Sequence, residues 1–407
     1  MNISQPPIPS PRASPRLLSL DALRGFDMFW IISGEGIFHG LANVVLTHHQ
    51  LYRNPDNWQI ATGADLTFWE RMAVGISNQL HHTPWNGFTF YDMIFPLFIF
   101  IAGMSMPYSL GRQLEQNGVG KTVVKKKIYV SLIRRTLILI LLGMVVNGLL
   151  QWKGYENTRF ASVLGRIALS CFFAGIIFLK VKPNWVIAWI IGILLGYWAA
   201  MALIPVPGYG AGVLTPEGNL SAFIDRQLLP GKLHRKVYDP EGLLSTVPAI
   251  ATALLGAVAG RFLKWQHEGW TTVKKALALI GGGLLLLLFG LLWNNFFPIN
   301  KNMWTSSFVL YAAGWSVLLF ALFYLVIDVA GLRKCAMPFV WIGTNSILIY
   351  MAAHGIVNFE ASSQFLFGGI INQTPEAWHS AVLWIGVALI QFAALYFLYK
   401  KKWFLKV

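Results

Sequence analysis

Four histidines, in two adjacent pairs, are the side chains of this sequence best suited to proton transfer. His48 and His49 form one pair, His81 and His82 the other. A free imidazole has a pKa near 6.5, so it can act as a general base at neutral pH. The second pair precedes Trp85-Asn86-Gly87, a polar turn just before an apolar stretch. The residues themselves do not choose among the four, and an interfacial histidine that only forms hydrogen bonds is the alternative interpretation.

Several carboxylates fall inside apolar stretches, where ionisable groups are costly and usually mark a site or a pathway. Asp92 lies about one and a half turns inside the stretch after the histidines, so we expect it to face protein or water. Glu35 lies late in the first apolar stretch and either faces the same site or is interfacial. Asp21 and Arg24, three residues apart, share a helix face and are expected to pair. Asp27 follows them in the same stretch.

Charged groups flank other apolar stretches, and each has two interpretations. Lys127, Arg134 and Arg135 could hold an anionic donor such as a nucleotide phosphate, or attract anionic lipid. Arg166 shares a helix face with Arg159, seven residues earlier. Two further carboxylates, Asp239 and Glu241, precede the sixth apolar stretch, where they either complement the helix dipole or bind substrate.

The elements that position these residues are membrane helices. Hydrophobic residues make up 56% of the 407 residues and charged residues only 12%, about half the charged fraction of a soluble domain. Apolar blocks of about twenty residues match the hydrocarbon thickness. We therefore predict an all-α, polytopic helical membrane protein with ten or eleven membrane elements, the eleventh a shorter one at 360–372. The predicted spans are 20–38, 89–110, 129–150, 160–180, 184–204, 243–263, 274–296, 305–328, 337–356 and 378–399.

The net charge of +15 is spread over short loops, which argues against a nucleic-acid partner. Every alternate loop is basic, so the positive-inside rule places both termini in the cytoplasm. The domain organisation expected is a disordered tail, 1–16, and one transmembrane domain, 17–407, without a removable signal peptide. The external loops are predicted at 39–88, 205–242, 298–304 and 357–377.

The sequence contains no metal-binding or nucleotide-binding motif that would indicate metal-dependent or nucleotide-dependent chemistry. The histidines have no metal-ligand spacing such as H-E-x-x-H, and no P-loop or dinucleotide fingerprint occurs. Cys171 and Cys335 have no evident pairing and are expected to be packing residues. We therefore expect no metal site.

Several stretches carry a resemblance to a known family. They are RLLSLDALRGFDM, HTPWNGFTFYDMIFPLFIFIAGMS, RFASVLGRIALSCF, AFIDRQLLPG, VYDPEGLLSTVPAIATALLGAVAG, PINKNMWTSSFVL and IGTNSILIYMAAH. In this order, from about residue 16 to 354, the sequence resembles the heparan-α-glucosaminide N-acetyltransferase family and its bacterial glucosamine N-acetyltransferase relatives. The H-x-x-WNG-x-x-x-x-D-x-x-FP and YDPEG-x-L-x-T motifs together are highly specific.

The resemblance implies about eleven membrane helices and transfer of acetyl from cytosolic acetyl-CoA to the amine of a glucosamine beyond the membrane. The family's catalytic histidine maps to His82, three positions before the Trp of the WNG turn. Human-type members have an Asn where this chain has Glu35, which puts the amide's role in doubt here. The resemblance also favours a homodimer, and with it we expect a bacterial inner-membrane location.

We accordingly expect His82 to act as a general base or as an acetyl carrier, and the residues alone leave both open. Asn86 and Asn345 are candidate donors to the oxyanion. Gly103, Gly143 and Gly256 would leave room for a pantetheine arm. The expected site comprises catalytic His82, Glu35 and Asn86; substrate-binding Asp92, Trp85, Asp239, Glu241, Arg166, Asn300, Lys301 and Asn345; and, for acetyl-CoA, Arg134, Arg135 and Lys127.

Two other functions remain compatible with the sequence. The first changes only the acceptor, to a hydroxyl of an envelope glycan or another amino sugar of the cell wall. The second is a proton-coupled sugar transporter in which Asp27, Glu35 and Asp92 relay protons. Transporter halves usually show an internal repeat, and we find none in this sequence.

Overall fold

The structure, a computed structural model, describes residues 17–54, 59–60, 65–116 and 121–405. The predicted tail at 1–16 lies outside the described residues. Within them the chain is all-α, with isolated β-bridges as its only extended pairing. The α-helices are α1 (Leu18–Phe29), α2 (Glu35–His49), α3 (Phe68–Gln79), α4 (Phe90–Gln116), α5 (Lys121–Val146), α6 (Val163–Lys180), α7 (Val186–Leu203), α8 (Leu220–Leu228), α9 (Thr246–Lys264), α10 (Thr272–Asn294), α11 (Ser306–Phe323), α12 (Arg333–Thr344), α13 (Ser346–Met351), α14 (Phe359–Gln373) and α15 (His379–Lys400).

The prediction of an all-α polytopic membrane protein is confirmed. Among the described residues, nine helical stretches are long and apolar enough to cross a membrane. The pair α12 and α13, bent by 64°, makes a tenth span if the two helices cross together. The eleventh predicted element is α14, which packs on α15 through a hydrogen bond from Ser363 Oγ to the Leu383 carbonyl (2.8 Å). α14 is not among the candidate spans.

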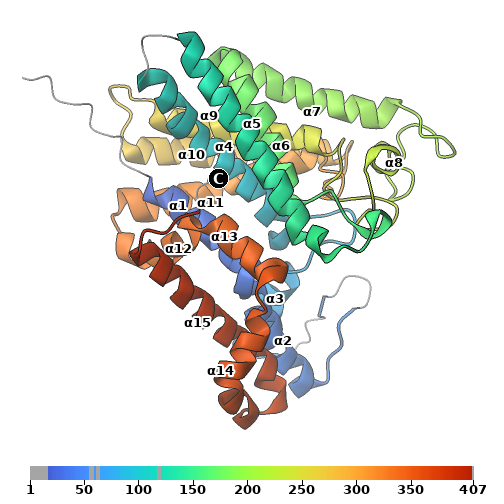
Figure 1. Cartoon of the computed structure of the whole chain (residues 1–407), viewed down its shortest axis with the longest axis vertical. Coiled ribbons are helices and arrows are strands. Elements are labelled where there is room, and N and C mark those ends of the chain that lie inside the picture. The colour runs from blue at the N-terminus through green and yellow to red at the C-terminus, as the bar shows by residue number, and fades with distance from the viewer. Residues whose placement is uncertain (1–16, 55–58, 61–64, 117–120, 406–407) are drawn as a thin grey trace, which may run out of the picture.

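The first span is longer than the sequence analysis predicted. α1 and α2 are joined by a π-helical turn, Trp30–Gly34, into one stretch of 32 residues, Leu18–His49. At 1.5 Å per residue it is about 48 Å long, against about 30 Å of hydrocarbon. The segment from 39 to 49 was predicted as loop, but it contains no proline and the helix continues. In Figure 1 the ends of α2 and α15 project together with α14 at the bottom, away from α7 at the top.

Glycines allow close packing between helices. A Cβ on Gly256 of α9 would lie 2.1 Å from the Phe100 carbonyl oxygen of α4, and one on Gly103 would lie 2.0 Å from that of Ala253. Such small-residue seams are typical of membrane helices. Gly143 likewise faces Ser162 Oγ, at 2.1 Å. These three glycines therefore serve helix packing, and the idea that they make room for a pantetheine arm is wrong.

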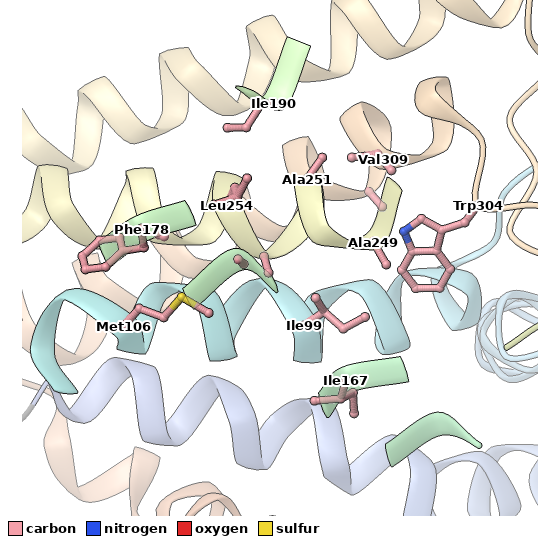
Figure 2. Close-up of a cluster of buried hydrophobic side chains, with 14 of the residues drawn as sticks. Ile99, Met106, Ile167, Phe178, Ile190, Ala249, Ala251, Leu254, Trp304 and Val309 are labelled. Carbon is pink, nitrogen blue, oxygen red and sulfur yellow. The ribbon is translucent and has the colours of Figure 1, made fainter. Parts of the chain in front are cut away.

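The largest buried cluster surrounds the α4–α9 seam and holds α6, α7 and α11 against it (Figure 2). Its members include Ile99, Met106, Ile167, Phe178, Ile190, Ala249, Leu254, Trp304 and Val309. A second cluster joins α1, α12 and α15 through residues such as Met28, Ile342 and Leu395. α4 runs antiparallel to α1 between these two groups. We call the end of the bundle where α4 begins the His82 end and the opposite end the Arg24 end.

Candidate active site

His82 is held by the carboxylate of Asp92. The distance from His82 Nδ1 to Asp92 Oδ1 is 2.8 Å, and Asp92 is only 1% exposed in the first turn of α4. The backbone N–H and hydroxyl groups of Thr83 and Thr89 all donate to the same carboxylate. Because an ionised carboxylate only accepts, the hydrogen-bond pattern assigns the proton to Nδ1 and leaves a lone pair on Nε2. This tautomer is the one that a general base needs.

Lys301 faces the same ring. Its Nζ lies 3.0 Å from each of the two ring nitrogens of His82 and 3.7 Å from Asp92 Oδ1. Burial and the positive charge of Lys301 lower the pKa of His82, outweighing the opposite effect of Asp92. Burial also lowers the pKa of Lys301 itself. His82 is therefore neutral at neutral pH, while 47% of its side chain remains exposed for a reactant.

Glu35 reaches this site through Tyr91. The Tyr91 hydroxyl donates to Glu35 Oε2, and the Tyr91 ring lies 4.7 Å from the His82 ring, centroid to centroid. Glu35 begins α2 directly after the π-helical turn, a feature frequent at functional sites. His39 Nε2 lies 3.5 Å from Glu35 Oε1. Glu35 thus contacts Tyr91, and Tyr91 in turn contacts His82.

His81 belongs to a different arrangement from His82. Its ring stacks on that of His39 at 4.1 Å, and its Nε2 lies 2.9 Å from Arg53 Nη1. Burial, together with the neighbouring His39 and Arg53, lowers the pKa of His81 to about 4. No motif in the sequence singled out Tyr91, His39 or Arg53. Only the position of Tyr91, next to Asp92, could have served as a signal.

The WNG turn joins three loops at the His82 end. Trp85 Nε1 donates to the Leu214 carbonyl (2.8 Å), and Asn300 Nδ2 donates to Asn86 Oδ1 (3.1 Å). Gly87 N donates to the Ile299 carbonyl (2.9 Å) from a backbone with φ of +122°, which favours glycine. The contact through Asn86 fixes which way its amide points. The loops 205–242 and 298–304 thereby frame the histidine.

Asp239 and Glu241 form a charged cluster with Arg159. Arg159 donates from Nε and Nη2 to the two Asp239 oxygens, at 2.9 and 2.5 Å, and from Nη2 to Glu241. Burial raises the pKa of Asp239, but the hydrogen bonds from Arg159 outweigh it and the net pKa is lowered. Both carboxylates precede α9, which begins only at Thr246, so the first of the two interpretations, that they complement its dipole, does not hold. Arg159 is their partner instead.

Arg166 is buried beside this cluster. Its Nη2 donates to the Gly242 carbonyl and to Ser245 Oγ, and its guanidinium carbon lies 4.9 Å from the centre of the Trp304 ring. Among the described residues, Nε and Nη1 of Arg166 have no hydrogen-bond partner. Arg166 can thus offer donors to a ligand or to an ordered water.

A second feature lies toward the Arg24 end. A cavity of about 300 Å³ opens between α4, α5, α6 and the bend of α12 and α13. Arg24, Ser105 and Arg135 supply polar groups to its wall. Of the α4 residues in the wall, Phe98 lies nearest to the His82 end. Between Asp92 and Phe98, the fully buried side chains of α4 are apolar: Met93, Ile94 and Leu97. The part of α4 between the heights of the cavity and the His82 site therefore contributes an apolar buried layer.

The predicted donor-binding residues are distributed unevenly about this cavity. Arg135 lines it, whereas Lys127 and Arg134 are exposed and not part of its wall. Asn345 is not beside His82. Its amide instead donates to the Trp403 carbonyl (3.0 Å) and accepts from Leu405 N (3.1 Å), holding the end of the described chain against the cavity.

One cluster of the described residues could hold a metal ion. His48, His49 and Glu70 bring ligand atoms within 4.8 Å of one another at the junction of α2 and α3. His49 Nε2 lies 2.9 Å from Glu70 Oε1, and the other Glu70 oxygen completes the capping box of α3 with Thr67. These contacts give the cluster a structural role without an ion.

Comparison with known proteins identifies the family. The family described as "Heparan-alpha-glucosaminide N-acetyltransferase, catalytic" matches residues 62–289, more than half of the chain. The heparan-alpha-glucosaminide N-acetyltransferases of Mus musculus and Homo sapiens are 29% and 30% identical to it, over 388 and 383 residues. This chain belongs to the heparan-alpha-glucosaminide N-acetyltransferase family. The resemblance drawn from the motifs is thereby confirmed.

The similar region covers only part of each relative. Each of the two relatives covers 80% of this chain, and the chain spans 56% of the mouse and 55% of the human heparan-alpha-glucosaminide N-acetyltransferase. The family match includes His82, Asp92 and the Arg159 cluster, while Glu35 and Lys301 lie outside it.

Proposed function

We propose that this chain is a transmembrane N-acetyltransferase that moves acetyl from cytosolic acetyl-CoA to the amine of a glucosamine-type sugar. The observation that carries the proposal is the His82–Asp92 pair, at 2.8 Å, with Nε2 left as a base. Family membership supports the choice of reaction. The basic loops support an orientation in which the Arg24 end faces the cytoplasm and the His82 end faces the periplasm.

The donor would enter from the cytoplasm. The cavity lined by Arg24 and Arg135 offers positive charge to an anionic nucleotide and an apolar wall to the arm that follows. The acetyl group would then cross the apolar layer to His82. Its carbonyl oxygen would lie near Lys301 Nζ and the Asn86 amide, which can stabilise the oxyanion.

The chemistry balances without a further reactant. The neutral sugar amine attacks the thioester carbonyl, a C–N bond forms, and His82 Nε2 takes the amine proton. The C–S bond then breaks, and the proton passes from His82 to the thiolate, giving the amide and free CoA. A variant in which His82 first accepts the acetyl group uses the same atoms in two steps. Asp92 would stabilise the charged ring in the direct route.

The acceptor would bind between the loops at the periplasmic end. Trp85 presents an aromatic face, Glu241 and Asp239 offer carboxylates, and Arg166 retains free N–H groups. Such groups suit sugar hydroxyls and a cationic amine. We also expect a homodimer, from the family resemblance.

The test is transfer from radiolabelled acetyl-CoA to glucosamine by the purified protein in detergent. We expect His82→Ala to lose at least about 100-fold in kcat, the scale of general-base catalysis, while CoA binding is retained. His267→Ala, in an exposed loop between α9 and α10, is the matched control and should keep full activity. Activity that survives in His82→Ala would remove this histidine from the chemistry. A wild type that binds CoA but acetylates only hydroxyl acceptors would support O-acetylation instead.

A further inference from the structure

Asp27 is a buried carboxylate in the first membrane helix that the site described above does not use. It is 1% exposed, and neither of its oxygens has a hydrogen-bond partner among the residues that the structure describes. Asp21, Glu35 and Asp92, the acids nearest to it in the two facing helices, all have partners. A polar group buried in a membrane without a partner lowers stability. A function would explain why the chain tolerates it.

Two contacts fix the height of Asp27 in the bundle. Arg24 Nη2 donates to Ser105 Oγ, and the Tyr91 hydroxyl donates to Glu35, so α1–α2 and α4 run antiparallel between these points. Asp27 lies one turn from Arg24 toward the His82 end. That places it level with about residue 101 of α4, between Ser105 and Phe98. The half of the cavity that is nearer to the His82 end lies at this height.

Asp27 also faces the appropriate side. Residues three apart on a helix lie on nearly the same face, and Arg24, three residues before Asp27, lines the cavity. Leu23, four residues before Asp27 and therefore close to it on the helix surface, belongs to the same buried cluster as Leu97 and Ile101 of α4. Asp27 therefore lies in the seam between α1 and α4, just beyond the Arg24 wall of the cavity and on the way to His82.

We propose that Asp27 is a binding residue for the acyl donor and accepts a hydrogen bond from an amide N–H of the pantetheine arm. This inference rests on the proposed function, which requires that arm to extend from the cavity toward His82. The arm carries two amide groups between the nucleotide and the sulfur, and in an apolar passage each N–H needs an acceptor. Asp27 is an acceptor at that height without a partner among the described residues, so a hydrogen bond from the arm would satisfy both the amide N–H and the carboxyl group.

The experiment compares two ligands on three variants of the full-length protein in detergent. CoA contains the pantetheine arm, and adenosine 3′,5′-bisphosphate contains much of the nucleotide without it. The variants are Asp27→Leu, which removes the acceptor, Asp27→Asn, which keeps a carbonyl oxygen, and Ser19→Ala. Ser19 is the matched control. Its hydroxyl is also buried and has no hydrogen-bond partner in the described part of the chain, but it lies at the start of α1, away from Asp27.

We expect Asp27→Leu to weaken CoA binding by about 3- to 10-fold, the effect of one hydrogen bond, and to leave binding of the bisphosphate unchanged. Asp27→Asn and Ser19→Ala should bind CoA within about twofold of wild type. The ligand-free Tm of Asp27→Leu should equal or exceed that of wild type, because an unpaired polar group has been removed.

Three results would overturn the inference. Asp27→Leu could bind CoA as tightly as wild type, it could lose affinity equally for both ligands, or its Tm could fall together with its CoA affinity. The last two would make Asp27 a structural residue. Wild-type protein that fails to bind CoA would instead overturn the proposed function, so the two failures are distinct.

Discussion

At the scale of single residues, the site depends on how the charged groups around His82 set the pKa of its imidazole ring. Asp92 Oδ1 lies 2.8 Å from Nδ1, and Lys301 Nζ lies 3.0 Å from both ring nitrogens. The carboxylate raises the pKa of the imidazole, while burial and the ammonium lower it. The net lowering keeps the base unprotonated at the pH where an amino sugar has begun to lose its own proton.

Replacement of Lys301 by methionine tests this balance. The change removes a positive charge from beside the ring, so the pKa of His82 should rise. The acid limb of the kcat/KM profile reports that pKa in the free enzyme, and it should move to higher pH. Lys274→Met is the control, because Lys274 is exposed near the start of α10 and its Nζ donates to the loop carbonyl of Gly269. This variant should leave the pH profile unchanged. An acid limb that does not move in Lys301→Met would show that His82 titrates independently of the lysine.

The sequence identified the central residues of the site but not their supports. His82, Asp92 and the WNG turn lie within eleven residues, so one motif contains them. His39 and Tyr91 reach the two histidines through ring contacts, and Arg53 reaches His81 through a polar contact, between segments that no local pattern connects. Asn345 was wrongly grouped with His82 because its contact, the segment at Trp403 and Leu405, lies about sixty residues away in the chain.

At the scale of elements, tight turns and short helices carry the loops of the His82 end. Gly87 adopts φ of +122° and binds the Ile299 carbonyl. α8 is tied to the start of the next span by the Asp225 carboxylate, which accepts from Leu243 N at 2.8 Å. These two contacts determine whether the loops frame the histidine correctly.

Gly87→Ala should therefore lower the stability of the protein by about 1–3 kcal/mol, since a side chain strains this backbone conformation. Activity should fall with it, because the turn carries Asn86. Gly75→Ala is the matched control. Gly75 lies within α3 with no atom near its would-be Cβ, and alanine there should raise stability by up to about 1 kcal/mol. Thermal unfolding of both variants gives the comparison, and equal Tm shifts would contradict the role of the turn.

Asp225 predicts a dependence of stability on pH. Burial raises its pKa to about 7, despite the hydrogen bond from Leu243 N. The folded protein therefore holds a proton between about pH 4 and 7 that the unfolded chain has lost, so the free energy of unfolding falls as pH rises through this window. Above pH 7 the full penalty is present.

Asp225→Asn removes this titration. We expect the loss of Tm between pH 5 and 8 to be smaller in the variant than in wild type. Asp65→Asn, at an exposed position, controls for the loss of one acidic residue. The same pH dependence in Asp225→Asn and wild type would contradict the assignment.

At the scale of the whole molecule, the described residues form nine candidate spans, and the bent pair α12 and α13 makes a tenth if it crosses as one. The sequence predicted an apolar span at each of these positions. Their apolar blocks and basic loops are local signals, which is why they could be read without a structure. The continuation of the first helix to His49 and the helices α3 and α8 within predicted loops were not foreseen, whereas α14 matches the eleventh predicted element. Their hydrophobic faces pack on neighbouring elements, so their helicity depends on tertiary contacts.

The two cysteines test the proposed orientation. Cys335 is exposed near the start of α12, beside Arg333 and Lys334, while Cys171 is part of the cavity wall within α6. A membrane-impermeant maleimide should label Cys335 in inverted vesicles and not in right-side-out vesicles. Cys335→Ser should abolish the labelling. Labelling from the right-side-out face would reverse the proposed topology.

The buried apolar layer formed by Met93, Ile94 and Leu97 has a consequence for the cell's energy supply. A passage long enough for a thioester would, if filled with water, short-circuit the ion gradients that the membrane stores. Apolar constrictions shed water and block ions even where an organic chain can pass. We therefore expect the idle protein not to dissipate the voltage of an energised membrane, and vesicles containing it to hold a proton gradient as long as empty ones.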